Sequence, residues 1–582
     1  MWLSDKQLMK KMTTYLFLTL GLLSSTGCMQ PTVFTDDDAA FEYREIYLPE
    51  NGSKEAQKLG LNNVDVDWGI WGHNLSVVLP DDPSMAVYAT VDGHPNQEQF
   101  CFSSDRLYKY IEHYIVDNFG ERHTTRFAIM PRDNNISCLC EQCVAKGCTY
   151  NDASPAVFSM IERLAQRFPN HFFFTSYYLT TRSLPLKPMP DNAGVLFSAI
   201  HYDLCTKATT REEETETLLA KWSKMTSHLY VWDYINNFDD YFTPFPVFTV
   251  MQRRFQLYKR AGVTGLFLNG SGTDFSTFSH IRTHILAALM HDPDADWQTL
   301  LQEKCEELYP VAGSAIARFM LSQEDFVKER GKMLPIYEGV AQSRKTYLDE
   351  EAFGKFHEEL LRLLPEAKKA EQDELTSMAQ AMMLTRLEIM RLDGHPTGCK
   401  PLLDQLAELP KKGIRIYSES YWTIDDYVNE YTSMWQTYES SHKKNLLLGK
   451  QLSPLSKLDE DYGDISILTD GLAGIPSNYH CGQLIFSAGT ALKIAIPHVQ
   501  GLKHLRIGLT SNRHFHIALP ASISLHSGGQ EIASQQPLPT SGLPQRVVVE
   551  FDIPSNAGGT LILTLVRNEE ERTMAIDEIE GF

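Results

Sequence analysis

The sequence predicts an α/β protein with a TIM-like (β/α)8 barrel over residues 41–310, an α-helical domain over 311–450 and a C-terminal β-sandwich over 451–582. Three observations predict this order. Strand-like and helix-like segments alternate to about residue 310, helical periodicity follows, and short alternating runs between Gly, Pro and Ser turns fill the remainder. About eight units over ~250–280 residues favour a barrel over an open doubly wound sheet, and the sequence has no Gly-rich phosphate motif to support the open sheet.

The barrel elements are bounded by ordinary start and stop signals. The helix expected over 103–120 has a Ser N-cap and a terminal Gly, and that over 153–169 has Pro near its start and another past its end. The strands are expected over residues 41–48, 74–80, 86–91, 125–131, 171–179, 194–203, 227–235 and 262–270. Further helices are expected over residues 212–225, 245–262 and 278–292.

After the barrel region the predicted secondary structure changes twice, first to helices and then to strands. Residues 350–370 and 374–392 have apolar residues at helical spacing, which predicts an α-helical domain. Beyond residue 451, runs such as 491–497 and 504–511 alternate apolar and polar residues, which predicts a β-sandwich. Its first and last segments resemble those of galactose-binding or discoidin-like sandwiches. Such domains either bind carbohydrate or brace a catalytic domain.

The composition argues against a nucleic-acid partner. The formal charge is −21 and the pI about 5.4, whereas phosphate binding needs a basic surface. Aromatic residues make up 11% of the chain, a level compatible with stacking against sugar rings.

Residues 1–28 are predicted to form an export signal. Three lysines precede an apolar run over 15–23 that is too short to span a bilayer. Small residues then lead to Cys28, a lipobox-like cysteine expected to carry a lipid, and residues 29–40 form a polar tether. We therefore expect a lipoprotein of the outer membrane, facing the periplasm or the cell surface, whose only membrane contact is its lipid anchor. Plain secretion is the alternative.

Polar and aromatic residues gather at the ends of the predicted strands, where a β/α barrel builds its active site. Carboxylates, amides and flat rings together suit a sugar: acids cleave the acetal, amides bind hydroxyls and rings stack. The expected catalytic residues are Asp133, Asp233 and Asp274. The expected substrate-binding residues are Trp71, His73, Arg132, Asn134, Tyr178, His201, Asp203, Trp232, Asn237 and Asn269. No cofactor is expected.

Four closely spaced cysteines follow the strand end at Asp133, namely Cys138, Cys140, Cys143 and Cys148. Disulfides are favoured in an exported protein. Four thiolates at short spacing can also close a zinc tetrahedron, so a zinc site is the alternative. With disulfides favoured, no metal is predicted.

The barrel region resembles a bacterial domain of unknown function related to glycoside hydrolase family 163, the endo-β-N-acetylglucosaminidases. The resemblance is carried by residues 72–73, 100–103, 132–143, 232–246 and 292–296. It implies a TIM-like glycosidase that cleaves a glycosidic bond in a complex glycan, with an N-acetylglucosaminide as one candidate substrate and carbohydrate as its partner. Where many members of the family carry glutamates, this chain has His201 and Asn269. A glycan-binding lipoprotein that has lost catalysis is the alternative.

Overall fold

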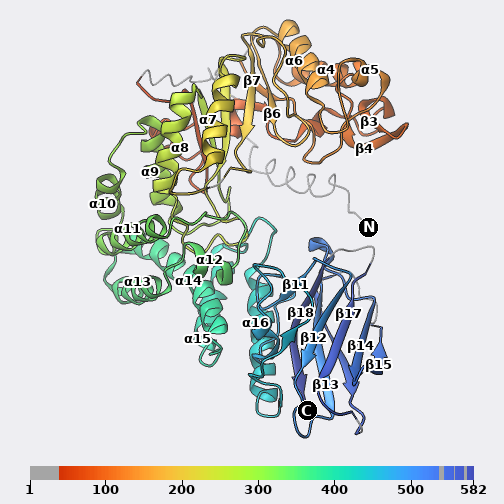
Figure 1. Cartoon of the computed structure of the whole chain (residues 1–582). Helices are drawn as coiled ribbons and strands as arrows, with labels where there is room; N and C mark the ends of the chain where they lie inside the picture. Colours follow the sequence, from red (N-terminus) through yellow and green to blue (C-terminus); the bar gives the residue numbers. More distant parts are fainter. Residues whose placement is uncertain (1–37, 123, 203, 537–542, 556, 569–572) are drawn as a thin grey trace. The chain divides into compact units, whose positions relative to one another are not determined.

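The protein is described here by a computed structural model, which covers residues 38–122, 124–202, 204–536, 543–555, 557–568 and 573–582. The N-terminal part contains a parallel sheet curled around its own interior (Figure 1). In the described residues this sheet consists of strands β1 (Tyr43–Tyr47), β2 (Trp68–Ile70), β5 (Arg126–Ala128), β6 (Phe172–Tyr177), β7 (Ala193–Ser198), β8 (His228–Tyr234) and β9 (Gly265–Asn269).

The strand order confirms a parallel α/β sheet but not a closed barrel of eight strands. The order is β1-β9-β8-β7-β6-β5-β2, and every pair is parallel. The first and second strands of the sequence are therefore its two edges, and within the described residues no backbone ladder joins them. Two predicted strands lie outside this sheet: residues 75–78 form a short 3-10 helix, and residues 88–91 belong to a separate hairpin.

Side chains from all seven strands meet inside the curled sheet. Because successive residues of a strand point to opposite faces, Tyr43, Trp232 and Phe267 point inward while Val231 and Leu266 point toward the helices. The interior is mostly aromatic, and Tyr43 stacks on Tyr230 with ring centroids 5.1 Å apart. The inner cluster consists of Tyr43, Tyr47, Val64, Trp68, Trp71, Ala128, Met130, Phe172, Phe174, Leu196, Tyr230, Trp232 and Phe267.

The seam between β1 and β2 is bridged by a buried glutamate. Glu45 on β1 accepts hydrogen bonds from the Val64 backbone N–H and from Asn51 Nδ2, both at 2.9 Å, and it also hydrogen-bonds the Tyr43 hydroxyl. Trp68 Nε1 on β2 donates to the same hydroxyl at 2.9 Å. Burial raises the pKa of Glu45 to about 8, so the group is held as a neutral acid at neutral pH.

Replacing this carboxyl should remove a pH dependence of stability. Between about pH 4.5 and about 8 the unfolded chain has released the Glu45 proton and the folded chain still holds it. Stability should therefore fall as pH rises through this window, by about 1.4 kcal/mol per pH unit. Glu45→Gln keeps the hydrogen bonds without titrating. The free energy of unfolding can be measured with denaturant at pH 5 and pH 8.5. Between these two values it should fall by a few kcal/mol less in the variant than in the wild type.

The matched control is Glu42→Gln, an exposed glutamate just before β1. It should follow the wild-type pH dependence. If Glu45→Gln also follows it, the bridging carboxyl is not held neutral in the folded protein.

Helices cover the outer face of the sheet, and their local sequences set their limits. Ser104 caps α4 by accepting from the Leu107 N–H, and α8 ends at Gly262, whose φ of 83° lies in the left-handed region. The longer helices are α4 (Asp105–Asn118), α6 (Ser154–Arg167), α7 (Thr210–Trp222), α8 (Phe248–Ala261) and α9 (Ser279–His291). The short ones are α2 (Lys54–Lys58), α3 (Val64–Asp67) and α5 (Glu141–Ala145).

A β-hairpin is inserted between β2 and β5 of the sheet. It consists of β3 (Tyr88–Val91) and β4 (His94–Phe100), which pair antiparallel. Its β4 strand contacts the loop after β5, where Gln99 accepts from the Arg132 N–H at 2.9 Å. The hairpin therefore braces a loop at the carboxyl end of the sheet.

The next part of the chain is helical, and one of its loops returns to the sheet. The helices are α10 (Trp297–Leu308), α11 (Gly313–Arg330), α12 (Val340–Thr346), α13 (Glu350–Leu363), α14 (Lys369–Leu392), α15 (Lys400–Leu406) and α16 (Ile424–Ser441). The loop before α16 hydrogen-bonds the loop after β8, because Tyr241 N–H donates to the Tyr417 carbonyl at 2.9 Å. Among the described residues, no helix is both long and apolar enough to cross a bilayer.

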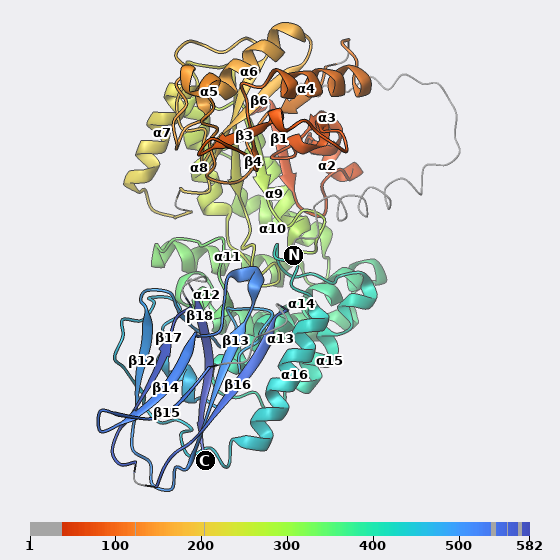
Figure 2. The ribbon, with the colours of Figure 1, turned by 90° about the vertical axis from the view of Figure 1, so that its right-hand side faces the viewer.

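The C-terminal part forms two antiparallel sheets, blue in Figure 2. Their apolar residues share one core, in which Leu492, Ile507 and Leu563 are buried together. One sheet has β10 (Ser453–Pro454), β12 (Ala491–Ile496), β17 (Leu561–Val566), β14 (Ser522–Ser527) and β15 (Gln530–Gln535). The other has β11 (Leu484–Phe486), β18 (Met574–Gly581), β13 (His504–Ser511) and β16 (Gln545–Asp552).

Candidate functional site

The candidate site lies at the carboxyl ends of the parallel strands. Tyr47, Asn269 and Tyr234 occupy one level of the sheet, because Asn269 pairs in register with the other two. Strand alternation gives Asn269 the same inward direction as Phe267, two residues earlier. The predicted residue Asn269 therefore lies at the mouth of the interior.

Two tryptophans stack on each other beside this level. The indoles of Trp71 and Trp232 stack with centroids 5.1 Å apart and planes 12° apart, and Phe267 packs against both. Both tryptophans are partly exposed. The structure thus brings together two residues predicted to bind substrate, and partly exposed aromatic rings can pack against the apolar face of a sugar ring.

Tyr178, His73 and His201, three of the predicted substrate-binding residues, lie side by side. The Tyr178 ring lies 6.2 Å from His73 and 5.8 Å from His201, between centroids. His73 Nδ1 lies 2.6 Å from the Pro131 carbonyl, which can only accept, so Nδ1 carries the proton and neutral His73 leaves Nε2 as an acceptor. Burial and the neighbouring Asp133 carboxylate raise the pKa of Tyr178 to about 12.

Asp133 is the exposed residue at the tip of the loop after β5. The residues beside it, Arg132 and Asn134, brace the loop. Arg132 donates to the Gln97 carbonyl at 3.1 Å, with its guanidinium 4.8 Å from the centre of the Phe100 ring. These contacts give Arg132 a role in holding the loop, and its predicted role in binding substrate stays a prediction.

Asn134 also has a bracing role in this loop. Its side chain donates to the Glu98 carbonyl at 2.7 Å and accepts from Gln99 and from the Ile136 N–H, both at 3.0 Å. With its amide committed to these three partners, Asn134 fixes the loop to β4. The prediction that it binds substrate is corrected on this ground.

Asp274 lies near Tyr47, in the turn that follows β9. The turn is fixed by Ser271, whose hydroxyl donates to the Asp274 carbonyl at 2.7 Å, and by a 3.0 Å bond from the Gly272 N–H to the Tyr47 carbonyl. Burial raises the pKa of the half-buried Asp274 carboxyl. This residue remains a candidate acid.

A further carboxyl, Glu419, comes from the loop before α16 and was not predicted. Its backbone N–H donates to the Phe238 carbonyl at 2.7 Å, and the Tyr337 hydroxyl donates to its carboxylate at 3.0 Å. Tyr421, two residues later, has a φ of 59°, in the left-handed region. A non-glycine residue in this region is strained, and such strain is common at functional sites.

The surroundings of Glu419 favour its protonated form. Although Glu419 is an exposed residue, partial burial of its carboxyl raises the pKa, and the charges of Asp239 and Asp133 raise it further. Asp239 is buried and accepts a 2.8 Å hydrogen bond from His480 Nε2. A carboxyl with a raised pKa beside an exposed carboxylate is the usual arrangement of a proton donor and its partner.

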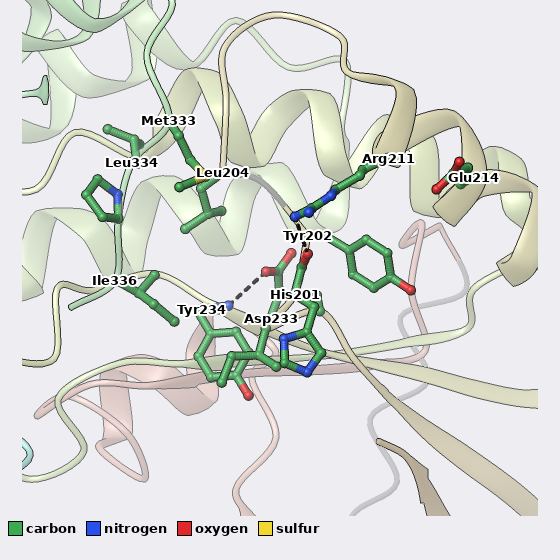
Figure 3. A pocket seen from close by; sticks show the side chains of 13 residues that line it. His201, Tyr202, Leu204, Arg211, Glu214, Asp233, Tyr234, Met333, Leu334 and Ile336 are labelled. Carbon is green, nitrogen blue, oxygen red and sulfur yellow. Dashed lines mark hydrogen bonds between the residues drawn. The ribbon is translucent and has the colours of Figure 1, made fainter. Parts of the chain in front are cut away.

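A cavity of about 560 Å³ opens at the ends of β7 and β8 (Figure 3). His201 and Tyr234 line one side of it, and Leu334 and Ile336 line another. Because His201 also stacks on Tyr178, the cavity adjoins the Asp133–Tyr178 pair. The volume is in the range of small-ligand sites.

The structure contradicts a catalytic role for Asp233. It lies between the inward-facing Trp232 and Tyr234, so strand alternation turns it toward helix α8. Its carboxylate is fully buried, pairs with the Arg254 guanidinium and accepts from the Tyr258 hydroxyl at 2.6 Å. Asp233 is among the residues that line the cavity at the ends of β7 and β8, but its carboxylate is 0% exposed and held by these structural partners.

Asn237 is likewise structural and does not bind substrate. Its buried amide donates to the Glu338 carbonyl at 2.7 Å and to the Tyr347 hydroxyl at 3.0 Å. It therefore fixes the loop after β8 to the helical region. Asp203 and Cys28, the two remaining predicted residues, lie outside the described part of the chain.

The fold and this site define a mixed α/β protein with a curled parallel sheet, C-terminal β-sheets and an acidic, aromatic site at the carboxyl ends of its strands. The chain belongs to the DUF4838 family, described as a domain of unknown function, whose family model matches residues 30–321. The predicted membership of a domain-of-unknown-function family is therefore confirmed, and the relation to glycoside hydrolase family 163 stays a prediction. No curated protein matches the chain.

Solved structures with some similarity include two glycoside hydrolases. A GH138 enzyme targeting pectin rhamnogalacturonan II is 8% identical with a TM-score of 0.30, over 86% of this chain and 79% of that one. A GH115 4-O-methyl-α-glucuronidase with specificity for decorated arabinogalactans is 10% identical with a TM-score of 0.27, over 94% and 81%. The lectin domain of lectinolysin is 16% identical with a TM-score of 0.19, over 24% and 96%.

Proposed function

We propose that the protein is a glycoside hydrolase that cleaves a glycosidic bond in a complex glycan. One observation carries the proposal: Glu419, a carboxyl with a raised pKa, lies within electrostatic reach of the exposed Asp133. Hydrolysis of an acetal needs one carboxyl to protonate the leaving oxygen and, in most families, a second to stabilise or attack the sugar carbon. The stacked Trp71 and Trp232 supply a surface for the ring.

In this mechanism Glu419 is the proton donor. Its proton goes to the glycosidic oxygen as the bond to the sugar carbon breaks, and Asp133 stabilises the positive charge that develops on the ring. A water molecule then adds its oxygen to that carbon and gives a proton back to Glu419, which completes the hydrolysis. Asp274, from the turn after β9, adds a third carboxyl at the mouth. Nε2 of His73 and the Asn269 amide are placed to bind hydroxyl groups.

An N-acetylglucosaminide is the substrate that we favour, on the resemblance to family 163. The substrate's own acetamide would then act as nucleophile, as in known exceptions to the two-carboxylate scheme. Asp133, with Tyr178 beside it, would orient the acetamide. This choice rests on family analogy, whereas the choice of proton donor rests on the raised pKa of Glu419 and on its contacts with Phe238 and Tyr337.

Asp133→Asn should retain glycan binding and lose turnover. Removing the charge leaves the tryptophan surface intact but takes away stabilisation of the developing cation, so we expect hydrolysis to fall by about 10²-fold. Hydrolysis of a panel of defined glycans, including N-acetylglucosaminides, measures turnover, and calorimetry measures binding. Asp117→Asn, an exposed substitution on α4, is the matched control.

A glycan-binding protein without catalysis is the second candidate, favoured by His201 and Asn269 where many relatives carry glutamates. It predicts binding without turnover on every glycan, with Asp133→Asn indistinguishable from the wild type. That outcome would overturn the hydrolase proposal.

We also propose that the protein is exported and anchored by a lipid on Cys28. The basic residues, short apolar run and small residues before this cysteine support the proposal. Fractionation of cells should find the wild type with membranes and Cys28→Ala in the soluble fraction. Equal distribution of the two would contradict lipid anchoring.

A further inference from the structure

Four cysteine sulfurs meet where the β3–β4 hairpin contacts the loop after β5. Cys101 Sγ lies 3.7 Å from Cys140 Sγ and 3.8 Å from Cys143 Sγ. All four sulfurs lie within 4.8 Å of one another. We call this group, which consists of Cys101, Cys138, Cys140 and Cys143, the four-cysteine cluster.

The spacing of the sulfurs fits one metal ion better than two disulfides. In a tetrahedral zinc–thiolate centre the Zn–S bond of about 2.3 Å places neighbouring sulfurs about 3.8 Å apart. A disulfide would draw two of the sulfurs together to about 2.05 Å. Cys101 is instead nearly equidistant from two different sulfurs, which is expected around a shared centre.

The surroundings of the cluster also suit thiolate ligands. The Thr90 N–H donates to Cys138 Sγ at 3.2 Å, and the Ser103 hydroxyl lies 3.2 Å from Cys143 Sγ, close enough to donate to a thiolate. Hydrogen bonds of this kind orient and stabilise metal-bound sulfur. Three of the four cysteines are buried in an apolar cluster and Cys140 is partly exposed, which leaves a side for metal entry.

We propose that the four-cysteine cluster binds one structural Zn²⁺. Cys101, from the end of β4, takes the place that the sequence suggested for Cys148. Binding deprotonates the thiols and releases their protons to solvent. The centre ties the hairpin to the loop that carries Asp133 and so fixes this carboxylate at the mouth of the sheet. The proposal does not depend on the hydrolase activity.

The test is the metal and thiol content of the full-length protein, purified without chelator or added thiol. Elemental analysis should find about one zinc per chain. After denaturation with chelator, all the cysteines of the cluster should react with a thiol reagent. Cobalt, loaded in place of zinc, should give the strong sulfur-to-metal absorption of a tetrahedral thiolate site. Two outcomes would overturn the proposal. In the first, the protein is metal-free and the cysteines of the cluster form disulfides. In the second, the protein is metal-free, the cysteines are reduced, and they bind no zinc when zinc is added.

Matched variants identify the ligands. Cys140→Ser, at the least buried position, should lose the zinc, whereas Cys148→Ser should retain it. Loss of zinc from Cys148→Ser and not from Cys140→Ser would overturn the ligand assignment. His284→Gln is a second control, because His280, His284 and Glu55 form another group that could hold a metal. Loss of the zinc from that variant alone would place the metal at the histidines and overturn the proposal.

Discussion

Glu419→Gln should lower the rate of glycan hydrolysis by about 10²–10⁴-fold, the usual contribution of a general acid. The substitution keeps the size and hydrogen-bonding capacity of the side chain but removes the proton that the leaving oxygen needs. Glycan binding should change little, so the loss should fall on kcat. Initial rates on the glycan that the wild type hydrolyses best provide the measurement.

The choice of leaving group separates acid catalysis from a general loss of fold. In an aryl glycoside the leaving group is a phenol, and an acidic phenol leaves without much protonation. Glu419→Gln should therefore lose far less activity on that substrate. The variant should also lack the fall in rate with rising pH that deprotonation of Glu419 causes in the wild type. Glu408→Gln, an exposed residue of the same helical region paired with Lys411, is the control. An equal loss on both substrates would contradict a donor role for Glu419.

Several mouth residues could be predicted because they lie within, or just beyond, single strands. Trp232 and Asn269 follow directly from finding the strand ends, since parallel strands bring their carboxyl ends to one edge. Trp71 was also expected in the site, although β2, the strand that places it there, was not predicted. The mistake at Asp233 was avoidable by the same reasoning. If Trp232 and Tyr234 face inward, strand alternation sends the residue between them outward.

Glu419 could not be found in this way. It lies in a loop of the helical region, and the local sequence around it has no catalytic signature. Only the tertiary hydrogen bonds to Phe238 and Tyr337 bring it to the mouth. Cys101 was hidden for the same reason, because its proximity to Cys140 and Cys143 arises from hairpin packing.

The number of strands was overestimated for a related reason. Residues 74–80 and 86–91 are apolar enough to resemble strands, and periodicity alone cannot separate a short buried turn or hairpin from a sheet strand. Glu45 is a charged residue of the first strand, and its side chain faces the interior of the curled sheet. Its inward position makes sense only where hydrogen-bond donors from a neighbouring segment, here Val64 and Asn51, can reach it.

Arg254→Ala should destabilise the protein by about 3–5 kcal/mol, because it leaves the buried Asp233 carboxylate without its counter-charge. Arg254 also donates to the Tyr202 carbonyl at 2.8 Å and so fixes the loop that carries His201. Denaturant unfolding measures the loss. Arg260→Ala on the same helix removes an exposed pair with Glu216 and should cost less than about 1 kcal/mol.

The double variant Arg254→Ala/Asp233→Asn distinguishes an orphaned charge from lost packing. Asparagine removes the charge that makes the single variant costly and can still accept from the Tyr258 hydroxyl. The double variant should therefore be more stable than Arg254→Ala alone, although Asp233→Asn by itself destabilises the wild type. If the two losses simply add, Asp233 is not held as a buried carboxylate by Arg254. A rescue would establish that this residue acts through the fold, which leaves proton transfer to the carboxyls at the mouth.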